Sequence, residues 1–226
     1  QMQGVIWLNG SLVDWQDAKI HILSHGLHYG GSVFEGERAY GGKIFKSRQH
    51  SERFLKSAEY LDFQIPYTVD ELIEAKQLVV DKNGFKNCYV RPVAWRGSEM
   101  MAVAAQMAKI HTAIAVWDWP SMFDINTKMK GIKLDIAEYR RPDPATAPSH
   151  SKAAGLYMIC TISKHKAERK GYADAMMLEH PWDLWNPDGT AKAWTPRIRQ
   201  VLEKLLQKAA QNPGANHYYI HVMEPS

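Results

Sequence analysis

One lysine, Lys152, stands among small residues in the stretch SHSKAAGLY at positions 149–157. The apolar spacing after it predicts a helix from about Lys152 to Lys170, ended by Gly171. A lysine amine must be neutral to attack an aldehyde, and both partial burial and the macrodipole at a helix N-terminus disfavour the ammonium form. Lys152 is therefore a candidate nucleophile, although a solvated surface lysine is the commoner alternative at such a junction.

Two arginines, Arg38 and Arg91, lie in strand-like runs with apolar neighbours. An unpaired guanidinium in such surroundings is costly, so each side chain needs a buried acid or an anionic ligand. We expect an anionic ligand for at least one of the two.

A hydrolase is a weaker alternative, because the chain has no GxSxG motif and GGSVFEG fails at the second glycine. Neighbouring polar residues could cleave esters promiscuously, but adjacency in the sequence is poor evidence for triad geometry. These residues are Ser149, His150, Ser151 and Lys152.

Two groups of histidines are conceivable metal ligands, but neither has a carboxylate or cysteine at a familiar spacing. The groups are His21, His25 and His28, and His217 and His221. Solvent-exposed or core histidines are the commoner explanation, so the sequence predicts no metal site.

The first half of the chain predicts two hairpins and two amphipathic helices. Asn9-Gly10 and Gly41-Gly42 are turn signals between apolar-alternating runs, and the period of two places Phe34 and Arg38 on one face of a strand. Helices are expected over residues 47–61 and 68–82, the second opened by a capping box and ended at Asn83-Gly84. The Met- and Ala-rich segment 98–108 fits either a short helix or a loop.

Polar and turn-forming residues at 118–131 indicate a boundary, after which a strand, a helix and a strand are expected. The fold class is therefore α/β of the α+β type, with two small domains at 1–125 and 126–226 and a cleft between them. From about residue 180 the tail differs in character, and its residues 195–211 predict an amphipathic helix.

Composition excludes several classes of protein. The 226 residues are 45% hydrophobic with a net charge of +4, and Lys and Arg are scattered among acids, so nucleic acid is not an expected partner. No run approaches the roughly 20 apolar residues that cross a bilayer, and no signal peptide is apparent. The only two cysteines, Cys88 and Cys160, lie in apolar runs and are expected to be buried thiols of a cytoplasmic protein.

Several motifs in the same order resemble the branched-chain aminotransferase family, whose fold-type IV enzymes use pyridoxal phosphate. They are LSHGLHYGGSVFEGERAY, HSERFLKSAEYL, IPYTVDELIEA, CYVRPV and SKAAGLYMICTISKHKAERKGYADAMML, which together extend over about residues 1–179. The resemblance implies an enzyme that moves an amino group between an amino acid or amine and a 2-oxo acid. Another pyridoxal-phosphate reaction, such as lyase chemistry, is compatible with the same fold.

The resemblance also implies roles for individual residues. Lys152 matches the lysine that forms a Schiff base with the cofactor, Tyr157 the tyrosine that binds the cofactor's phenolic oxygen, and Arg53 the arginine that holds the phosphate. Further matches fall where the family lines its substrate pocket or carboxylate site: Tyr29, Phe34, Arg38, Tyr89 and Arg91.

After Leu178 the resemblance ends, without a recognisable acid for the pyridine nitrogen or a helix N-terminus for the phosphate. The nearby acids Glu179, Asp183 and Asp188 sit in no matching motif. We therefore expect a fold-type IV chain with a truncated or replaced C-terminal domain, in a homo-oligomer that covers the exposed edges. The alternative is a non-catalytic remnant or chimera of this fold.

Overall fold

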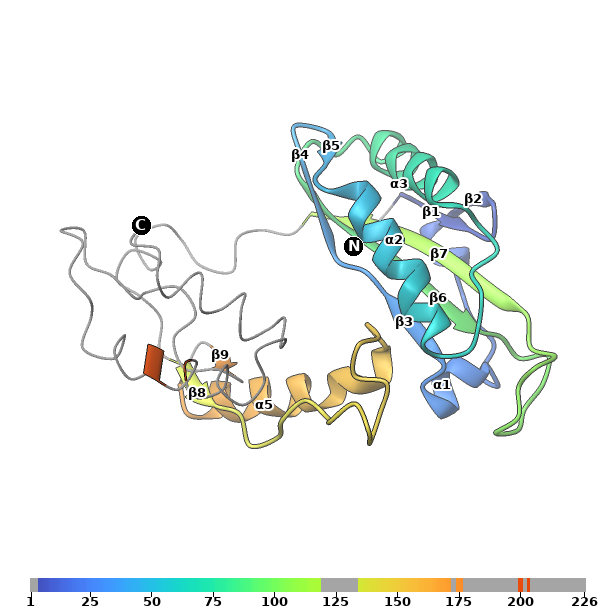
Figure 1. Cartoon of the computed structure of the whole chain (residues 1–226). Helices are drawn as coiled ribbons and strands as arrows, with labels where there is room; N and C mark the ends of the chain where they lie inside the picture. The colour runs from blue at the N-terminus through green and yellow to red at the C-terminus, as the bar shows by residue number, and fades with distance from the viewer. Residues whose placement is uncertain (1–3, 119–133, 172–173, 177–198, 201–202, 204–226) are drawn as a thin grey trace. The chain divides into compact units, whose positions relative to one another are not determined.

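The computed structural model describes residues 4–118, 134–171, 174–176, 199–200 and 203 (Figure 1). These fall into two compact units, one of residues 1–131 and 141–161 and the other of residues 132–140 and 162–226. The predicted boundary at residue 125, and the tail apart from residues 199–200 and 203, lie outside the described residues. In the part of the chain that is described, no helix is long and apolar enough to cross a membrane.

The first unit is built on a seven-stranded sheet in the order β2-β1-β7-β6-β4-β5, with β3 also paired to β6. Its strands are β1 (Val5–Leu8), β2 (Ser11–Asp14), β3 (Ser32–Phe34), β4 (Glu37–Tyr40), β5 (Lys43–Ile44), β6 (Cys88–Arg96) and β7 (Ile110–Trp117). All pairs in this sheet are antiparallel. Both predicted hairpins are confirmed, because Asn9-Gly10 and Gly41-Gly42 have the positive φ angles that such turns need.

The predicted strand 32–40 is interrupted at Glu35 and Gly36, and Glu35 lies opposite Pro92 of β6. Glu35 N donates to Pro92 O at 2.9 Å, but proline has no N–H to donate in return, so the regular ladder stops there. The register nevertheless continues, since Phe34 pairs with Val93 and Arg38 with Tyr89. The prediction that Phe34 and Arg38 share a face of the sheet is therefore confirmed.

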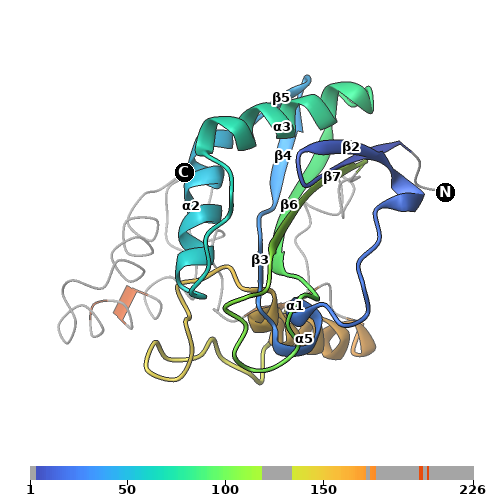
Figure 2. The same cartoon turned by 90° about the vertical axis from the view of Figure 1, so that its right-hand side faces the viewer.

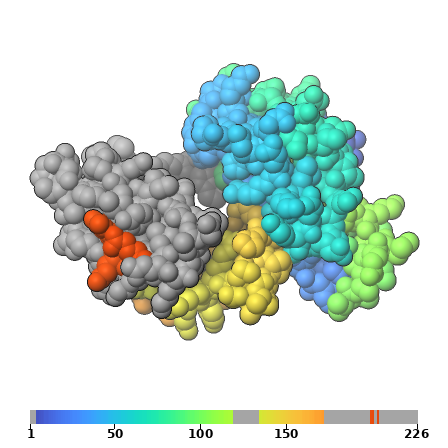
Figure 3. All heavy atoms as spheres, viewed as in Figure 1, coloured from blue at the N-terminus to red at the C-terminus, as the bar shows by residue number. Residues whose placement is uncertain are grey.

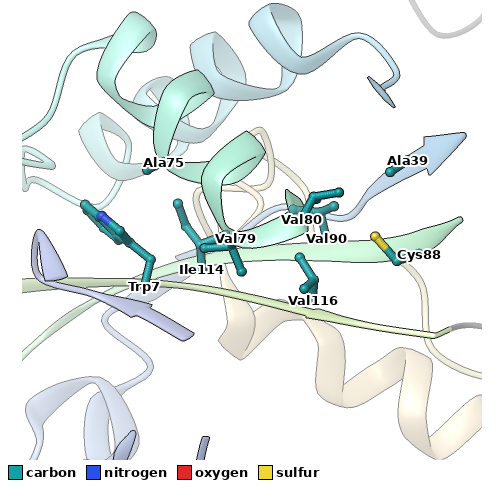
Figure 4. Packing of buried hydrophobic residues seen from close by; sticks show 9 residues of the cluster. All are labelled: Trp7, Ala39, Ala75, Val79, Val80, Cys88, Val90, Ile114 and Val116. Carbon is teal, nitrogen blue, oxygen red and sulfur yellow. The ribbon is translucent and has the colours of Figure 1, made fainter. Parts of the chain in front are cut away.

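Helices α2 (Ser47–Glu59) and α3 (Val69–Lys82) cover one face of the sheet (Figure 2). α3 begins with the predicted capping box, in which Glu71 N donates to Thr68 Oγ1 and Thr68 N donates to the Glu71 carboxylate. Under α3 lies the core shown in Figure 4, formed by Trp7, Ala39, Ala75, Val79, Val80, Cys88, Val90, Ile114 and Val116. The opposite face carries Phe34 and Arg38.

A buried ion pair ties the two helices to the sheet. Lys76 Nζ of α3 donates to both carboxylate oxygens of Glu37 in β4, at 3.0 and 2.9 Å, and to Ser47 O and Ser51 Oγ of α2. Lys76 and Glu37 are both almost completely buried. Burial raises the pKa of Glu37 and lowers that of Lys76, while each charge opposes the shift of the other.

Shorter elements connect this scaffold. They are the 3₁₀ helix η1 (Trp15–Asp17) and the helix α1 (His25–Tyr29). Residues 97–109 form no helix, so the segment for which helix and loop were both open is a loop.

Cys88 is a buried thiol as predicted, but Cys160 is only half-buried, which corrects the second prediction.

The second unit contains the predicted strands β8 (Leu134–Ile136) and β9 (Asp174–Met176), which pair in parallel. The helix expected from Lys152 begins later: α5 covers Met158–Arg169 and follows the 3₁₀ helix η2 (Ala154–Tyr157). Lys152 therefore lies before helix α5, and the helix macrodipole does not act on its amine as predicted, since that effect falls off within the first turn.

Candidate functional site

The backbone of Lys152 is attached to the sheet. Phe34 N of β3 donates to Lys152 O at 3.2 Å, and the next residue, Ala153, forms a β-bridge with Val33. From the other side, Lys152 N donates to Ser57 Oγ of α2 at 3.0 Å. The lysine thus belongs to an extended segment held between a strand and a helix.

The Lys152 amine lies among aromatic rings. Its Nζ donates to the Tyr157 hydroxyl at 2.5 Å and lies 4.7 Å from the centre of the Phe34 ring. The Phe34 and Tyr157 rings meet edge to face, with centroids 4.7 Å apart. Tyr157 lies five positions after Lys152, which is too many for one helical face. The intervening 3₁₀ helix η2 returns the chain so that the Tyr157 hydroxyl reaches the Lys152 amine.

Arg91 of β6 lies on the same face of the sheet as Phe34. Its guanidinium carbon is 4.4 Å from the centre of the Phe34 ring and 5.1 Å from that of Tyr89, and Nη2 donates to the Tyr89 hydroxyl at 2.9 Å. Its Nε is buried and has no hydrogen-bond partner among the described residues. A buried cationic N–H without an acceptor suits an anionic ligand, as expected from the sequence.

The glycine at position 36 leaves room for the Tyr89 hydroxyl beside Arg91. A Cβ atom built on Gly36 would lie 2.0 Å from the Tyr89 hydroxyl oxygen, closer than any real contact. Any other residue would therefore push the Tyr89 hydroxyl away from Arg91.

Arg53 of α2 is oriented by a buried acid. Its Nε and Nη2 donate to the two carboxylate oxygens of Glu35, at 2.6 and 2.8 Å, and His50 Nδ1 lies 2.9 Å from the same carboxylate. Burial alone would raise the pKa of Glu35, but the hydrogen bonds from Arg53 and His50 outweigh it and lower the pKa to about 2. The Glu35 side chain is fully buried, whereas that of Arg53 is 56% exposed.

This geometry leaves part of the Arg53 guanidinium for a ligand. Nη1 has no hydrogen bond to any residue that the structure describes. An open hollow of about 490 Å³ beside it is also lined by Lys56 and His150. One edge of Arg53 is thus fixed by Glu35, and the other suits an anion such as a phosphate.

Replacing Glu35 with glutamine is expected to lower the free energy of unfolding at pH 7 by about 2 kcal/mol, after a discount for the exposed partner Arg53. The carboxylate pKa is lowered in the folded state, so the stabilisation is complete above the unfolded-state value near 4.5 and is lost as the pH falls through about 2. Urea unfolding at several pH values measures this.

The exposed neighbour Glu52 provides the matched control for this measurement, as Glu52→Gln. The prediction is wrong if Glu35→Gln and the wild type differ as much at pH 2 as at pH 7, because most of the stabilisation by the ionised carboxylate should be lost once the pH falls to its folded-state pKa of about 2.

The structure brings most of the predicted site residues together. Phe34, Tyr89, Arg91, Lys152 and Tyr157 are joined by the contacts above, and Arg38 follows on the same face of the sheet, opposite Tyr89. Arg53 belongs to the same unit, and its pKa is raised chiefly by Glu35 and to a smaller extent by nearby Tyr157.

Tyr29 does not join this group. This residue is 50% exposed and its ring stacks on His25, with centroids 4.8 Å apart, in a separate hollow of about 840 Å³. The resemblance to the branched-chain aminotransferase family placed Tyr29 with the others, and its substrate contact stays a prediction.

Sequence reasoning did not single out Glu35 or Ser57 as parts of the site. For Glu35 a signal existed, since the period of two places this acid on the helix-covered face, where it needs a buried partner. For Ser57 there was none, because its bond to Lys152 joins residues 95 positions apart.

The residues of the alternative hydrolase and metal sites have other partners in the structure. The Ser151 hydroxyl is buried and donates to Ser57 O at 2.8 Å, so it is turned to helix α2. His21 Nδ1 accepts from Leu23 N, and His28 Nε2 lies 2.8 Å from Ile22 O. No group of three or more metal-binding side chains occurs among the described residues; Glu179, Asp183, Asp188, His217 and His221 lie outside them.

Residues 32–184 match the family model of class IV amino-transferases, which is more than half of the chain. The chain therefore belongs to the class IV aminotransferase family. It is 43% identical over 176 residues to a probable branched-chain-amino-acid aminotransferase of Rickettsia felis, covering 77% of this chain. It spans only 59% of that relative's length.

Solved structures agree with this assignment. The branched-chain aminotransferase of Escherichia coli superposes with a TM-score of 0.75 at 29% identity, covering 92% of this chain and 76% of that one. The branched-chain aminotransferase of the archaeon Thermoproteus uzoniensis, solved with norvaline, gives a TM-score of 0.73 at 29% identity, covering 92% and 76%. The chain thus has the predicted mixed α/β, fold-type IV architecture.

Proposed function

We propose that this protein is an aminotransferase that moves an amino group between an amino acid and a 2-oxo acid, with pyridoxal phosphate attached to Lys152. The observation that carries the proposal is the Lys152 amine, held by the Tyr157 hydroxyl against Phe34 beside the incompletely satisfied Arg91. Family membership supports the reaction class, and the names of the relatives favour branched-chain amino acids as donors.

The described residues fit this cofactor. Lys152 supplies an amine for the cofactor's aldehyde, and Tyr157 supplies a hydroxyl for its phenolic oxygen. Arg53 supplies a partly free guanidinium for its phosphate. When bound, pyridoxal phosphate supplies an electron sink that stabilises negative charge on the substrate's α-carbon.

The chain's own residues would then divide the work. Lys152 would hold the cofactor by its aldehyde, and its free amine would move the proton at the substrate's α-carbon. Arg91 and Arg38 bind carboxylate, with Tyr89 holding Arg91 in place, while Phe34 gives the pocket an apolar wall. The predicted substrate contact of Tyr29 stays a prediction.

The experiment is a single half-reaction. The 226-residue chain is loaded with pyridoxal phosphate and mixed with L-leucine, and chromatography follows the appearance of pyridoxamine phosphate and the 2-oxo acid. We expect both products in equal amounts. They should form much faster than with pyridoxal phosphate and leucine in the absence of protein. Binding without conversion would instead favour the non-catalytic alternative, and ester cleavage alone would favour the hydrolase.

The protein is also proposed to be a homo-oligomer. Exposed large apolar side chains occur on two segments, residues 20–29 and 97–109, and both segments line one hollow. They are Ile20, Ile22, Leu23, Leu27 and Tyr29 on the first segment, and Met101, Val103 and Met107 on the second. The atoms of the two segments lie next to each other in Figure 3. An apolar surface of this kind is typical of an interface between chains. Sedimentation analysis tests whether the protein is a homo-oligomer, and a monomer would contradict this proposal.

The predicted cytoplasmic location stays a prediction.

A further inference from the structure

The end of helix α2 holds the segment that carries Lys152. The last carbonyls of a helix lack intrahelical partners and must find others. In this final turn Leu61 N donates to Ala58 O, and Ser57 O accepts instead from the Ser151 hydroxyl at 2.8 Å. An otherwise unused helix carbonyl thus fixes the residue just before Lys152.

Ser57 makes a second bond to the same segment through its side chain. Its Oγ accepts from Lys152 N at 3.0 Å, so one residue of α2 binds two consecutive residues of the loop. Ser57 is 1% exposed and Ser151 is completely buried, so water does not compete for these bonds. With Phe34 N bound to Lys152 O, both backbone polar groups of the lysine are occupied.

Ser57 also lies one helical turn after Arg53, on the same helix. α2 therefore carries both the guanidinium assigned to the phosphate and the contact that fixes the lysine backbone. A ligand that binds both the Arg53 guanidinium and the Lys152 amine requires a defined spacing between these two groups. Small misplacements of reacting groups lower the reaction rate strongly.

We propose that Ser57 is a positioning residue, which fixes Lys152 relative to Arg53 so that the amine and the guanidinium engage one phosphorylated aldehyde together. This inference rests on the proposed function. It does not require Ser57 to touch the ligand.

The test compares two aldehydes, pyridoxal phosphate and pyridoxal, which differ only in the phosphate. The rate at which each becomes attached to Lys152 is measured by borohydride reduction and peptide mapping. In the wild type the phosphate accelerates attachment, because Arg53 binds it while Lys152 attacks. In Ser57→Ala we expect this phosphate advantage to fall about tenfold, while attachment of pyridoxal changes little.

Ser47→Ala is the matched control, because Ser47 is another serine of α2 whose buried hydroxyl has no partner among the described residues. Its phosphate advantage should equal that of the wild type. Ser151→Ala removes only the other bond and should give a smaller fall, which also covers the case that Ser57→Ala does not fold.

The outcomes separate the two proposals. If both aldehydes slow equally in the Ser57 and Ser151 variants, or if neither rate changes, Ser57 has only a structural role and the inference is wrong. If the wild type itself shows no attachment at Lys152, the proposed function fails and this inference falls with it.

Discussion

Replacing Lys152 with alanine is expected to abolish the borohydride-stable attachment of pyridoxal phosphate at this position and to slow the leucine half-reaction by at least about 100-fold. Two functions are lost together, since the same amine binds the aldehyde and moves the proton. The change should not unfold the protein, because the segment is held through backbone groups of Lys152, which alanine keeps.

The control is Lys43→Ala, an exposed lysine of β5 outside the site. It should behave as the wild type in both the mapping and the half-reaction. If the Lys152 variant still gives a specific adduct, or if reduction labels many surface lysines equally in the wild type, Lys152 is not the attachment site. The proposed function would then be wrong for this chain.

Replacing Lys76 with methionine is expected to lower the free energy of unfolding at pH 7 by about 3–5 kcal/mol, the usual cost of leaving one member of a buried ion pair without its partner. Glu37 would keep its burial and lose the ammonium bound to both its oxygens. Urea unfolding measures the difference, and Lys82→Met, an exposed position of the same helix, is the matched control.

The pH dependence of this variant identifies the cause. Burial already raises the pKa of Glu37, and loss of the ammonium, which opposes that shift, raises it further. A carboxyl group with a raised folded-state pKa favours folding while it is protonated, so the variant should lose stability as the pH rises through that pKa.

The double variant Glu37→Leu with Lys76→Met completes this test. It removes both charges and should recover most of the loss, as apolar replacements of buried ion pairs do. An equally large loss in the double variant would show that packing around Lys76, and not the unpaired carboxylate, carries the effect.

The two faces of the sheet have different chemistry. On the helix-covered face, the acids Glu35 and Glu37 are buried and each is paired with a base from a helix. On the other face lie Phe34, Tyr89 and Arg91, and Lys152 approaches them. Glu35 and Glu37 therefore attach the helices to the sheet, and Glu35 also orients the Arg53 guanidinium.

The sequence by itself determined what depends on near neighbours in the chain. The two turns, the capping box of α3 and the shared face of Phe34 and Arg38 follow from local φ angles, side-chain caps and the period of two. The family and most of the candidate site were also predictable, because their motifs are continuous stretches of sequence.

Tertiary structure alone decided what depends on contacts between distant residues. Lys152 was expected at a helix N-terminus but is bound to β3 and to Ser57, since pairing with the sheet overrides the local helical preference. Tyr29 is close to Phe34 in the sequence, yet its ring stacks on His25 of the same helix α1 and lines another hollow. Bonds between residues tens of positions apart leave no periodic pattern, so only the folded chain shows which groups meet.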